Sequence, residues 1–244
     1  MSHLLSGMIL GARQNKLPYY LRARAMQPDD LIGYWTFGEP IGSTTAIDLS
    51  GYANNATYAQ CLLGQPGIGD GFTSVYFGGL SGSVNIFPIA GEFNLDEFTI
   101  SAWVRDDSGA DANSRTIMRL NVNGPNNNYF YKGTDALTIV NQYTSSGTSD
   151  ISAYKITPPI TNWFHVGTTV SKLGDANILY INGIQRSTTT TLGIGVGGTL
   201  VSNGAIIGTF QLGLNANVWK GWIAHPQVYK AALSPVKMFK LAIK

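Results

Sequence analysis

Alternating apolar and polar residues recur along the chain, and the clearest run lies at residues 162–186. Residues 163–171 are predicted to form a β-strand, in which Phe164, Val166, Thr168 and Val170 share one face. A second strand at residues 177–181 ends at Asn182 and Gly183. Because a type I′ turn needs positive φ at both central positions, Asn-Gly is a strong hairpin signal. This stretch therefore predicts the centre of an antiparallel sheet.

Similar short runs recur on both sides of this stretch, separated by turns rich in Asn and Gly. Residues 44–58 are predicted to form a loop-rich hairpin, and residues 64–71 an irregular segment. The pattern predicts an all-β fold, a two-sheet antiparallel sandwich. The further strands are expected at residues 31–37, 73–77, 84–87, 98–105, 116–122, 128–131, 137–143, 151–156, 205–210 and 219–229.

The two ends of the chain break this pattern. Pro18 and Pro28 bracket a piece long enough for two helical turns. Near the other end, Ser234 and Pro235 are suited to the N-cap and first position of a short basic helix. We therefore expect an N-terminal arm at residues 1–28, a strand-rich domain at 29–233 and a C-terminal helix at 234–244.

Composition agrees with one large β domain. The chain has 244 residues, 29 of them Gly, with 44% hydrophobic and only 12% charged residues. A single cysteine, Cys61, excludes an internal disulfide and is interpreted as a small packed hydrophobe. Because no apolar run approaches 18 residues, and the first 12 lack a basic start, we expect neither a membrane span nor a signal peptide.

Charge is distributed unevenly along the chain. All 14 acidic residues lie between Asp29 and Asp175, whereas residues 1–28 and 176–244 hold basic residues and no acid. Such polarity suits a protein that docks its ends on an acidic surface. Alternatively, the C-terminal strands interleave with the acidic middle and the charges mix in the folded sandwich.

The N-terminal arm is too apolar to stay solvated and too short to fold alone. We expect it to be the assembly element that docks on a partner surface. The alternative is that it lies across its own sandwich and covers an edge strand. The arm residues expected to make assembly contacts are Leu4, Leu5, Arg13, Lys16, Tyr19, Tyr20, Arg22 and Arg24.

Seven segments occur in an order that resembles laminin-G-like domains of the concanavalin A-like lectin/glucanase superfamily. The match spans residues 31–234, and it implies a concanavalin A-like jelly roll. The segments are Y-W-T-F-G-E (34–39), D-L-S-G (48–51), T-S-V-Y-F-G-G (73–79), F-T-I-S-A-W-V (98–104), W-F-H-V-G-T-T-V followed by I-L-Y-I-N-G (163–183), A-I-I-G (205–208) and W-K-G-W-I-A-H-P-Q-V-Y-K-A-A-L-S (219–234).

The opening segment, together with P-G-I-G-D-G-F-T-S-V-Y-F at residues 66–77, is most similar to versions in bacteriophage structural proteins. This resemblance implies a capsid-decoration or tail protein in the virion, with other virion proteins and further copies of itself as partners. The alternative is an extracellular carbohydrate-binding module for a cell-surface glycan. We expect no direct contact with nucleic acid or membrane.

Catalytic chemistry is not predicted. Glycoside hydrolases need two carboxylates flanking one bond, and the glucanase relatives carry them as Glu-x-Asp-x-Glu on one strand. No such run occurs here, and the adjacent Asp96 and Glu97 precede an apolar strand, where they suit a turn. The histidines lack zinc-ligand spacing, and His165 is expected to be a packed, hydrogen-bonded residue. The protein is therefore expected not to be an enzyme.

Calcium is the candidate cofactor that the resemblance implies, because laminin-G-like relatives bind it through Asp, Asn and backbone oxygens at a loop rim. Two family acids are replaced here, by Ala224 before the last strand and by Asn182 in the hairpin turn. We therefore predict no metal and no cofactor. The side chains that would supply oxygens are Asp48, Asn54, Asp106 and Asp107.

Overall fold

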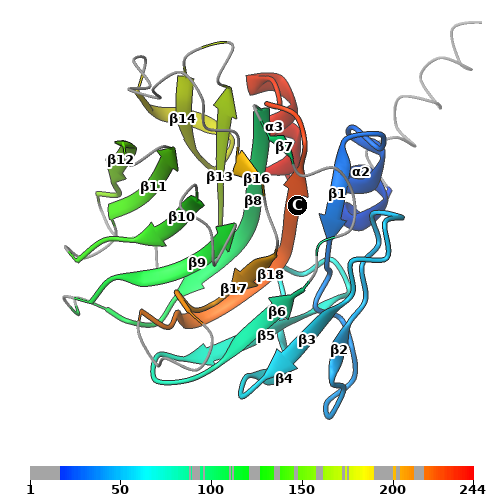
Figure 1. Cartoon of the computed structure of the whole chain (residues 1–244). Helices are drawn as coiled ribbons and strands as arrows, with labels where there is room; N and C mark the ends of the chain where they lie inside the picture. Colours follow the sequence, from blue (N-terminus) through cyan, green and yellow to red (C-terminus); the bar gives the residue numbers. More distant parts are fainter. Residues whose placement is uncertain are drawn as a thin grey trace, which may run out of the picture.

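Two antiparallel sheets of eight strands each face one another in the computed structural model (Figure 1). This arrangement confirms the predicted two-sheet sandwich and is consistent with a jelly roll. The structure describes residues 17–87, 89, 94–95, 97–109, 111, 113–120, 127–134, 138–145, 148–157, 162–171, 174, 176–189, 200–201, 204–211 and 217–244.

The first sheet has the order β15-β14-β13-β8-β18-β5-β4, and β1 also pairs with β18. In the turn between β14 and β15, φ is 51° at Asn182 and 74° at Gly183, as a type I′ turn requires. The strands are β1 (Leu31–Tyr34), β4 (Leu62–Pro66), β5 (Thr73–Gly78), β8 (Glu97–Asp106), β13 (Phe164–Ser171), β14 (Ala176–Ile181), β15 (Ile184–Thr189) and β18 (Lys220–Tyr229).

The second sheet has the order β12-β11-β10-β9-β17-β6-β3-β2. Its strands are β2 (Thr45–Ala46), β3 (Ala56–Ala59), β6 (Ser83–Ile86), β9 (Arg115–Leu120), β10 (Asn127–Lys132), β11 (Thr138–Ser145), β12 (Thr148–Lys155) and β17 (Ala205–Ile207). A separate two-stranded ladder joins β7 (Asn94–Leu95) to β16 (Leu200–Val201).

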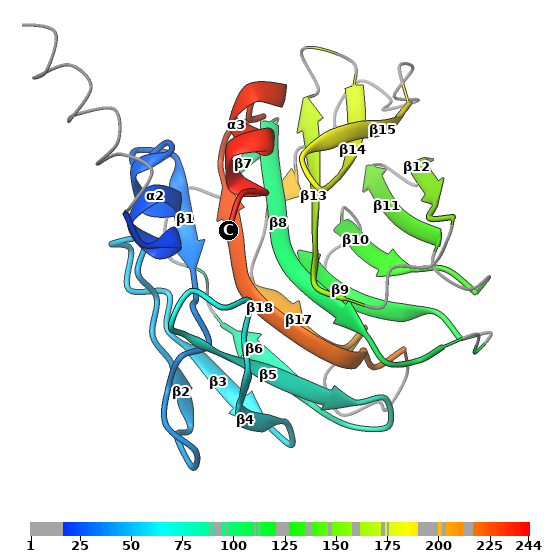
Figure 2. The ribbon, with the colours of Figure 1, turned by 180° about the vertical axis from the view of Figure 1, so that it is seen from behind.

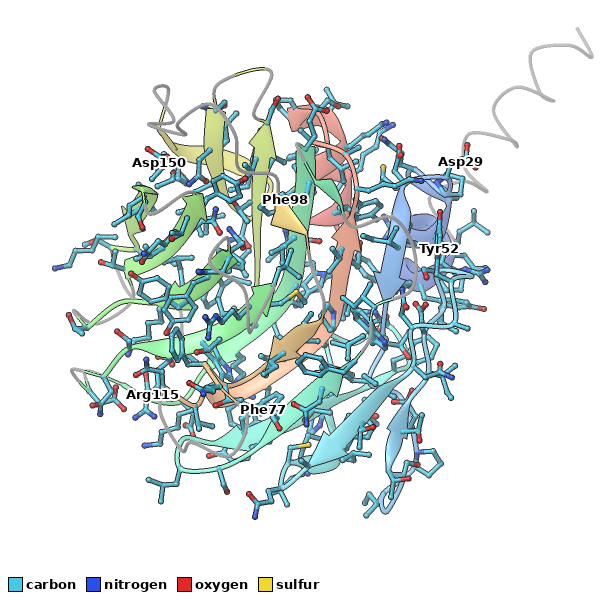
Figure 3. The ribbon with its side chains drawn as sticks, in the orientation of Figure 1. Asp29, Tyr52, Phe77, Phe98, Arg115 and Asp150 are labelled. Atoms are coloured by element: carbon cyan, nitrogen blue, oxygen red, sulfur yellow. The ribbon has the colours of Figure 1, made fainter. Side chains whose placement is uncertain are left out.

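The main core fills the space between the two sheets. Alternate residues of β8, from Phe98 to Val104, point into it, as the sequence period predicts. Phe77 of β5 and Phe98, both labelled in Figure 3, belong to this core. Trp35 and Trp219 are fully buried in it.

The edge strand β4 was not expected, and neither was the short ladder of β7 and β16. Residues 64–71 were predicted to be irregular, but Leu62–Pro66 forms the edge strand β4. Its pairing with β5 shifts register between Leu62 and Gln65, where Gly64 has φ of 74°. This bulge explains why the segment carries no alternating pattern.

Two short helices lie on the outer face of the first sheet (Figure 2). Helix α2 (Tyr19–Ala25) buries Tyr19 and Ala23, and α3 (Pro235–Leu241) buries Met238 and Leu241. The predicted helix start is confirmed, with Ser234 at the N-cap and Pro235 next, although the Ser234 side chain makes no capping hydrogen bond. These side chains join Trp103 and Tyr229 of the sheet in a second apolar cluster.

Helix α2 contains the second half of the expected assembly arm. The Tyr19 hydroxyl donates to the carbonyl of Leu241 at 3.1 Å, and Arg22 Nη2 donates to that of Ile243 at 2.9 Å. Residues 19–25 thus lie across their own sandwich, over a sheet face. Leu4, Leu5, Arg13 and Lys16 lie outside the described residues.

Candidate functional site

A histidine on β18 sits in a buried polar cluster beneath α2. The ladder of β18 is irregular between Ala224 and Gln227, and His225 there has φ of 51°. The His225 Nδ1 atom lies 2.8 Å from the Tyr34 hydroxyl, and its Nε2 atom lies 2.9 Å from Asp70 Oδ2. The cluster ties β1, β18 and the loop before β5 together.

The same cluster is closed to substrates. Tyr34 and His225 are fully buried, and the Tyr19 ring lies edge-on to the imidazole with centroids 4.7 Å apart. Burial raises the pKa of Tyr34 well above its usual value, so its phenol stays neutral. Partial burial opposes ionisation of Asp70, but the His225 hydrogen bond and charge lower the pKa of that carboxyl. These residues act as a brace for the fold.

His165 of β13 is also enclosed on this face. Its ring packs edge-on to Trp103 with centroids 5.5 Å apart, which confirms the packing predicted for it. Burial lowers the pKa of His165 to about 3, so the imidazole is neutral. The expected hydrogen bond to the ring is not formed, since neither ring nitrogen has a partner within the described part of the chain.

Asp48, the first calcium candidate, is engaged by protein donors. Its Oδ1 atom accepts the backbone N–H groups of Tyr34 and Ser50, each at 2.9 Å. Its Oδ2 atom accepts the Ser50 hydroxyl at 2.6 Å and the Asn54 N–H at 2.9 Å. The Asn54 amide in turn donates to the carbonyl of Ile32 at 2.7 Å. Asp48 and Asn54 therefore connect β1 to the following loop.

The other two calcium candidates lie at the end of β8, beside a lysine that sequence reasoning missed. Lys132 is fully buried, and its Nζ atom lies 2.8 Å from Ser108 Oγ and 3.5 Å from Asp111 Oδ1. The Ser108 hydroxyl donates to Asp106 at 2.6 Å, and the Tyr76 hydroxyl donates to Asp107 at 3.1 Å. An internal ammonium thus supplies positive charge to this loop.

The four candidate residues consequently lie at two separate places, Asp48 and Asn54 beside β1 and Asp106 and Asp107 at the end of β8. Across the ranges that the structure describes, no group of three or more His, Cys, Asp and Glu side chains is arranged to hold a metal ion.

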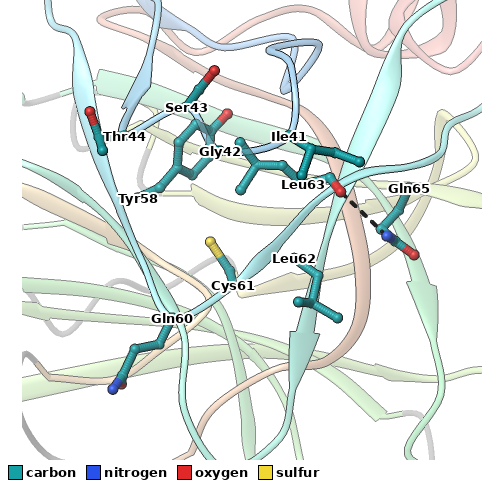
Figure 4. A pocket seen from close by; sticks show the side chains of 10 residues that line it. All are labelled: Ile41, Gly42, Ser43, Thr44, Tyr58, Gln60, Cys61, Leu62, Leu63 and Gln65. Carbon is teal, nitrogen blue, oxygen red and sulfur yellow. Dashed lines mark hydrogen bonds between the residues drawn. The ribbon is translucent and has the colours of Figure 1, made fainter.

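A pocket of about 380 Å³ opens beside the edge strand β4 (Figure 4). Its polar groups bond to the protein itself: the Tyr58 hydroxyl donates to Glu39 at 2.6 Å, and the Gln65 amide to the carbonyl of Leu63 at 3.3 Å. Burial raises the pKa of Cys61 to about 11, so its thiol is a weak nucleophile. The lining residues are Ile41, Gly42, Ser43, Thr44, Tyr58, Gln60, Cys61, Leu62, Leu63 and Gln65, none of them charged.

The outer face of the second sheet carries a continuous row of side chains, here called the outer row. Strand register places its members directly opposite one another, and opposite residues share a face of the sheet. The row crosses all eight strands of the sheet, from β2 to β12. Its members are Thr45, Thr57, Asn85, Ile206, Arg119, Tyr129, Gln142 and Ile151.

Aromatic rings gather around the middle of the outer row. The Arg119 guanidinium carbon lies 4.2 Å from the Phe210 ring centroid, and Nη1 donates to the Phe210 carbonyl at 3.0 Å. Tyr129 meets Phe210 edge-on at 5.0 Å and stacks on Tyr131 at 4.0 Å with an interplanar angle of 13°. Because Tyr131, Phe210 and Gln142 are only half-buried, a ligand can reach this cluster.

Arg119 is incompletely satisfied in this position. It is 9% exposed, and its buried Nε atom has no hydrogen-bond partner. The buried Oδ1 atom of Asn85, two strands away in the same row, also lacks one. Burial lowers the pKa of Arg119, which nevertheless stays charged at neutral pH. A buried donor or acceptor without a hydrogen bond costs roughly 1–3 kcal/mol, and an external partner would offset that cost.

A second arginine stacks on an aromatic ring on the outer side of the first sheet. The Arg105 guanidinium lies 4.3 Å from the Trp222 ring centroid, and Trp222 packs against Tyr76 with centroids 4.8 Å apart. Trp222 is half-buried, whereas Trp103, Trp35 and Trp219 are buried. This cluster is a natural control for the one around Arg119.

The outer row lacks the carboxylates of a hydrolase. Asp150 is the only acidic residue in the eight strands of the second sheet. It lies opposite Tyr143, whose ring is in the core, so it faces inward. Glu97 begins β8 in the other sheet and accepts the Ser171 hydroxyl at 2.8 Å. Asp96 is outside the described residues.

Comparison with known sequences identifies the fold. Residues 77–237 match the concanavalin A-like lectin/glucanases superfamily. No curated protein matches the sequence. Among the described residues, no helix is long and apolar enough to cross a membrane.

Solved structures of low sequence identity share this fold. The botulinum neurotoxin serotype D/C binding domain has a TM-score of 0.67 at 16% identity, with 88% of this chain and 52% of that chain covered. The serotype D binding domain has a TM-score of 0.68 at 14% identity, with 90% of this chain and 52% of that chain covered. Domain 4 of an extracellular arabinanase from Geobacillus stearothermophilus has a TM-score of 0.63 at 18% identity, with 88% of this chain and 98% of that chain covered. The chain spans about half the length of the toxin domains.

Proposed function

Because the chain belongs to the concanavalin A-like lectin/glucanase superfamily, we propose that it is a non-catalytic module that binds a carbohydrate. The outer row and its aromatic rings carry this proposal. Half-buried rings such as Tyr131 and Phe210 offer flat apolar faces to the C–H faces of a sugar. Arg119, Asn85 and Gln142 supply donors and acceptors for hydroxyl groups beside these rings.

Structural neighbours support this proposal by their ligands. The arabinanase domain was solved in complex with arabinotriose, and the botulinum neurotoxin DC binding domain in complex with SialylT. Cell entry of botulinum neurotoxin type C depends on interaction with two ganglioside molecules. Since one fold hosts many functions, the residues of the outer row remain the stronger argument.

The proposal includes the absence of catalysis. Hydrolysis of a glycosidic bond takes two carboxyl groups about 5–9.5 Å apart, and the strands of the second sheet direct their single acid, Asp150, toward the core. We expect no reducing sugar from laminarin, agar or xylan above a heat-inactivated control. Sustained release would overturn this part of the proposal.

Binding to a glycan array, followed by calorimetry on the best ligand, tests the function. Tyr131→Ala and Phe210→Ala should each weaken binding by about tenfold, because each removes an exposed stacking surface worth roughly 1 kcal/mol or more. Trp222→Ala, on the other sheet, is the matched control and should bind like the wild type. Equal binding by all four proteins would place the ligand elsewhere.

A structural role in a bacteriophage virion is the second candidate, and the two functions are compatible. The two segments most similar to phage proteins supply Tyr34 and Asp70, the partners of His225. The N-terminal arm, with Leu4, Leu5, Arg13 and Lys16, is the proposed anchor to a capsid or tail protein or to further copies of this chain.

The position of α2 sharpens the test of this second candidate. Deleting residues 1–28 would remove the buried Tyr19, so loss of binding could reflect unfolding. Deleting residues 1–16 leaves α2 in place. If this truncated protein folds but no longer co-purifies with particles, the arm is the anchor. Unchanged co-purification would contradict that role.

A further inference from the structure

We infer that the ligand of the outer row is an anionic saccharide whose carboxylate or sulfate group is bound by Arg119. The inference rests on the proposed function and names the class of sugar. It begins from the charges that face outward on the second sheet.

The strands of this sheet direct basic side chains outward and no acidic one. Arg119 lies at its centre, and Lys155 of β12 faces outward as well, since its neighbour Tyr154 packs against the core. No acidic side chain faces outward from the eight strands, because Asp150 is turned to the core. An anion near Arg119 therefore meets attraction without a competing carboxylate on the strands.

The two arginines of β9 differ in their ion pairing. Arg115 Nη2 lies 2.6 Å from Asp111, and Arg115 Nη1 donates to two backbone carbonyls. Arg119 has no ion-pair partner among the described residues. Both guanidinium groups are largely buried, and the Nε atom of each lacks a hydrogen-bond partner. Among the described residues, the two therefore differ in the carboxylate that pairs with Arg115 alone.

The guanidinium of Arg119 is oriented to bind an oxyanion. Stacking on Phe210 and the Nη1 bond to the Phe210 carbonyl fix its plane. The Nε atom has no hydrogen-bond partner, and the fork of an arginine matches carboxylate and sulfate oxygens. The half-buried Tyr131 and Gln142 beside it offer contacts to the sugar ring.

Calorimetry on the full chain tests the inference with three probes: an oligogalacturonate, a sulfated heparin fragment and neutral arabinotriose. We expect one anionic probe to bind at least about tenfold more tightly than arabinotriose, as a charge-assisted hydrogen bond allows. Added NaCl should weaken that binding. The carboxylated and sulfated probes distinguish the two sources of charge.

Two substitutions assign the preference to its residue. Arg119→Gln should abolish the preference for the anionic probe. Arg105→Gln removes a guanidinium stacked at 4.3 Å on Trp222 of the other sheet, and it should leave the preference intact. If Arg119→Gln does not fold, Arg119→Lys keeps the charge without the fork, and its binding to the anion should still be weakened.

The failures of the two proposals are distinguishable. Equal affinity of the wild type for the neutral and anionic probes overturns the anionic ligand but leaves a carbohydrate-binding module. An equal loss of preference in Arg105→Gln and Arg119→Gln also overturns it, because the effect is then general electrostatics. Absence of binding to every probe and to the glycan array overturns both.

Discussion

The outer faces of the two sheets differ in which segments cover them. On the first sheet, α2 and α3 bury Trp103 and Tyr229, and an internal network engages His225. On the second sheet, no described helix covers the outer row (Figure 1), and the half-buried ring of Phe210 packs on Arg119. The outer face of the second sheet, here called the open face, thus carries no described helix, although Ile206 and Arg119 in its middle are largely buried.

The unsatisfied polar atoms of the two faces differ in charge. Under the helices, the atoms without a hydrogen bond include the neutral Trp103 indole and His165 imidazole, and the charged one, Asp70 Oδ2, lies 2.9 Å from His225 Nε2 in an ion pair. On the open face, one belongs to the guanidinium of Arg119. Because an unpaired buried charge costs more than an unpaired neutral group, the open face has the stronger need for an external partner. Substitutions at four positions test this difference between the two faces.

Tyr19→Ala should have the largest effect. The ring is 2% exposed and packs on His225 and Trp103, so its loss should lower the free energy of unfolding by about 3 kcal/mol or more. Urea denaturation measures this change. Tyr20→Ala is the control, because Tyr20 is only half-buried and should cost less. Equal costs would show that α2 is not docked as described.

His165 should make stability depend on pH. Its folded-state pKa of about 3 lies below the ordinary value near 6.5, so only the unfolded chain binds this proton between those values. Stability should fall as pH drops through that window, at a rate of up to about 1.4 kcal/mol per unit from this group. In His165→Gln that contribution should vanish. Parallel pH profiles of the two proteins, by urea denaturation, would contradict the buried neutral imidazole.

Asp70→Asn should have a smaller effect on the same face. The pKa of Asp70 is lowered, so its ionised form stabilises the folded state above the ordinary carboxyl pKa near 3.9 and the benefit is lost as pH falls below it. The variant should melt at a lower temperature than the wild type at pH 7, with the gap closing in acid. Asp29→Asn, at an exposed position, should leave melting unchanged. A constant gap down to pH 2 would exclude the His225 contact as its source.

Local patterns in the sequence predicted much of the fold. The alternation in residues 163–171, the Asn182-Gly183 turn and the proline-led C-terminal helix each depend on neighbours in the chain. The docking of α2 does not, since its partners on β18 and α3 lie more than 200 residues away. Sequence reasoning therefore left open whether the arm covers its own sandwich.

The candidate site could not be predicted from the sequence for a related reason. The outer row is assembled from eight strands, with members as distant as Thr45 and Ile206. A one-residue change of register would turn any member to the other face. The signal present in the sequence was the alternation of Tyr129 and Tyr131 near Arg119, which acquires meaning only with Phe210 beside it.

The smallest expected effect is on the stability of Arg119→Leu, compared with Arg115→Leu. Arg119 has no carboxylate partner in the part of the chain that the structure describes, so replacing it by an apolar residue should change the free energy of unfolding by about 1 kcal/mol or less, with stabilisation as the expected sign. Arg115→Leu strands Asp111 and two carbonyl groups, and it should be clearly destabilising. Urea denaturation of both variants measures the difference.

If Arg119→Leu is as damaging as Arg115→Leu, then Arg119 is a structural brace like the covered cluster around His225, and the open face loses its distinction. If the two differ as expected, the cost of holding Arg119 in place is not explained by folding, which is the result that a ligand-binding arginine requires.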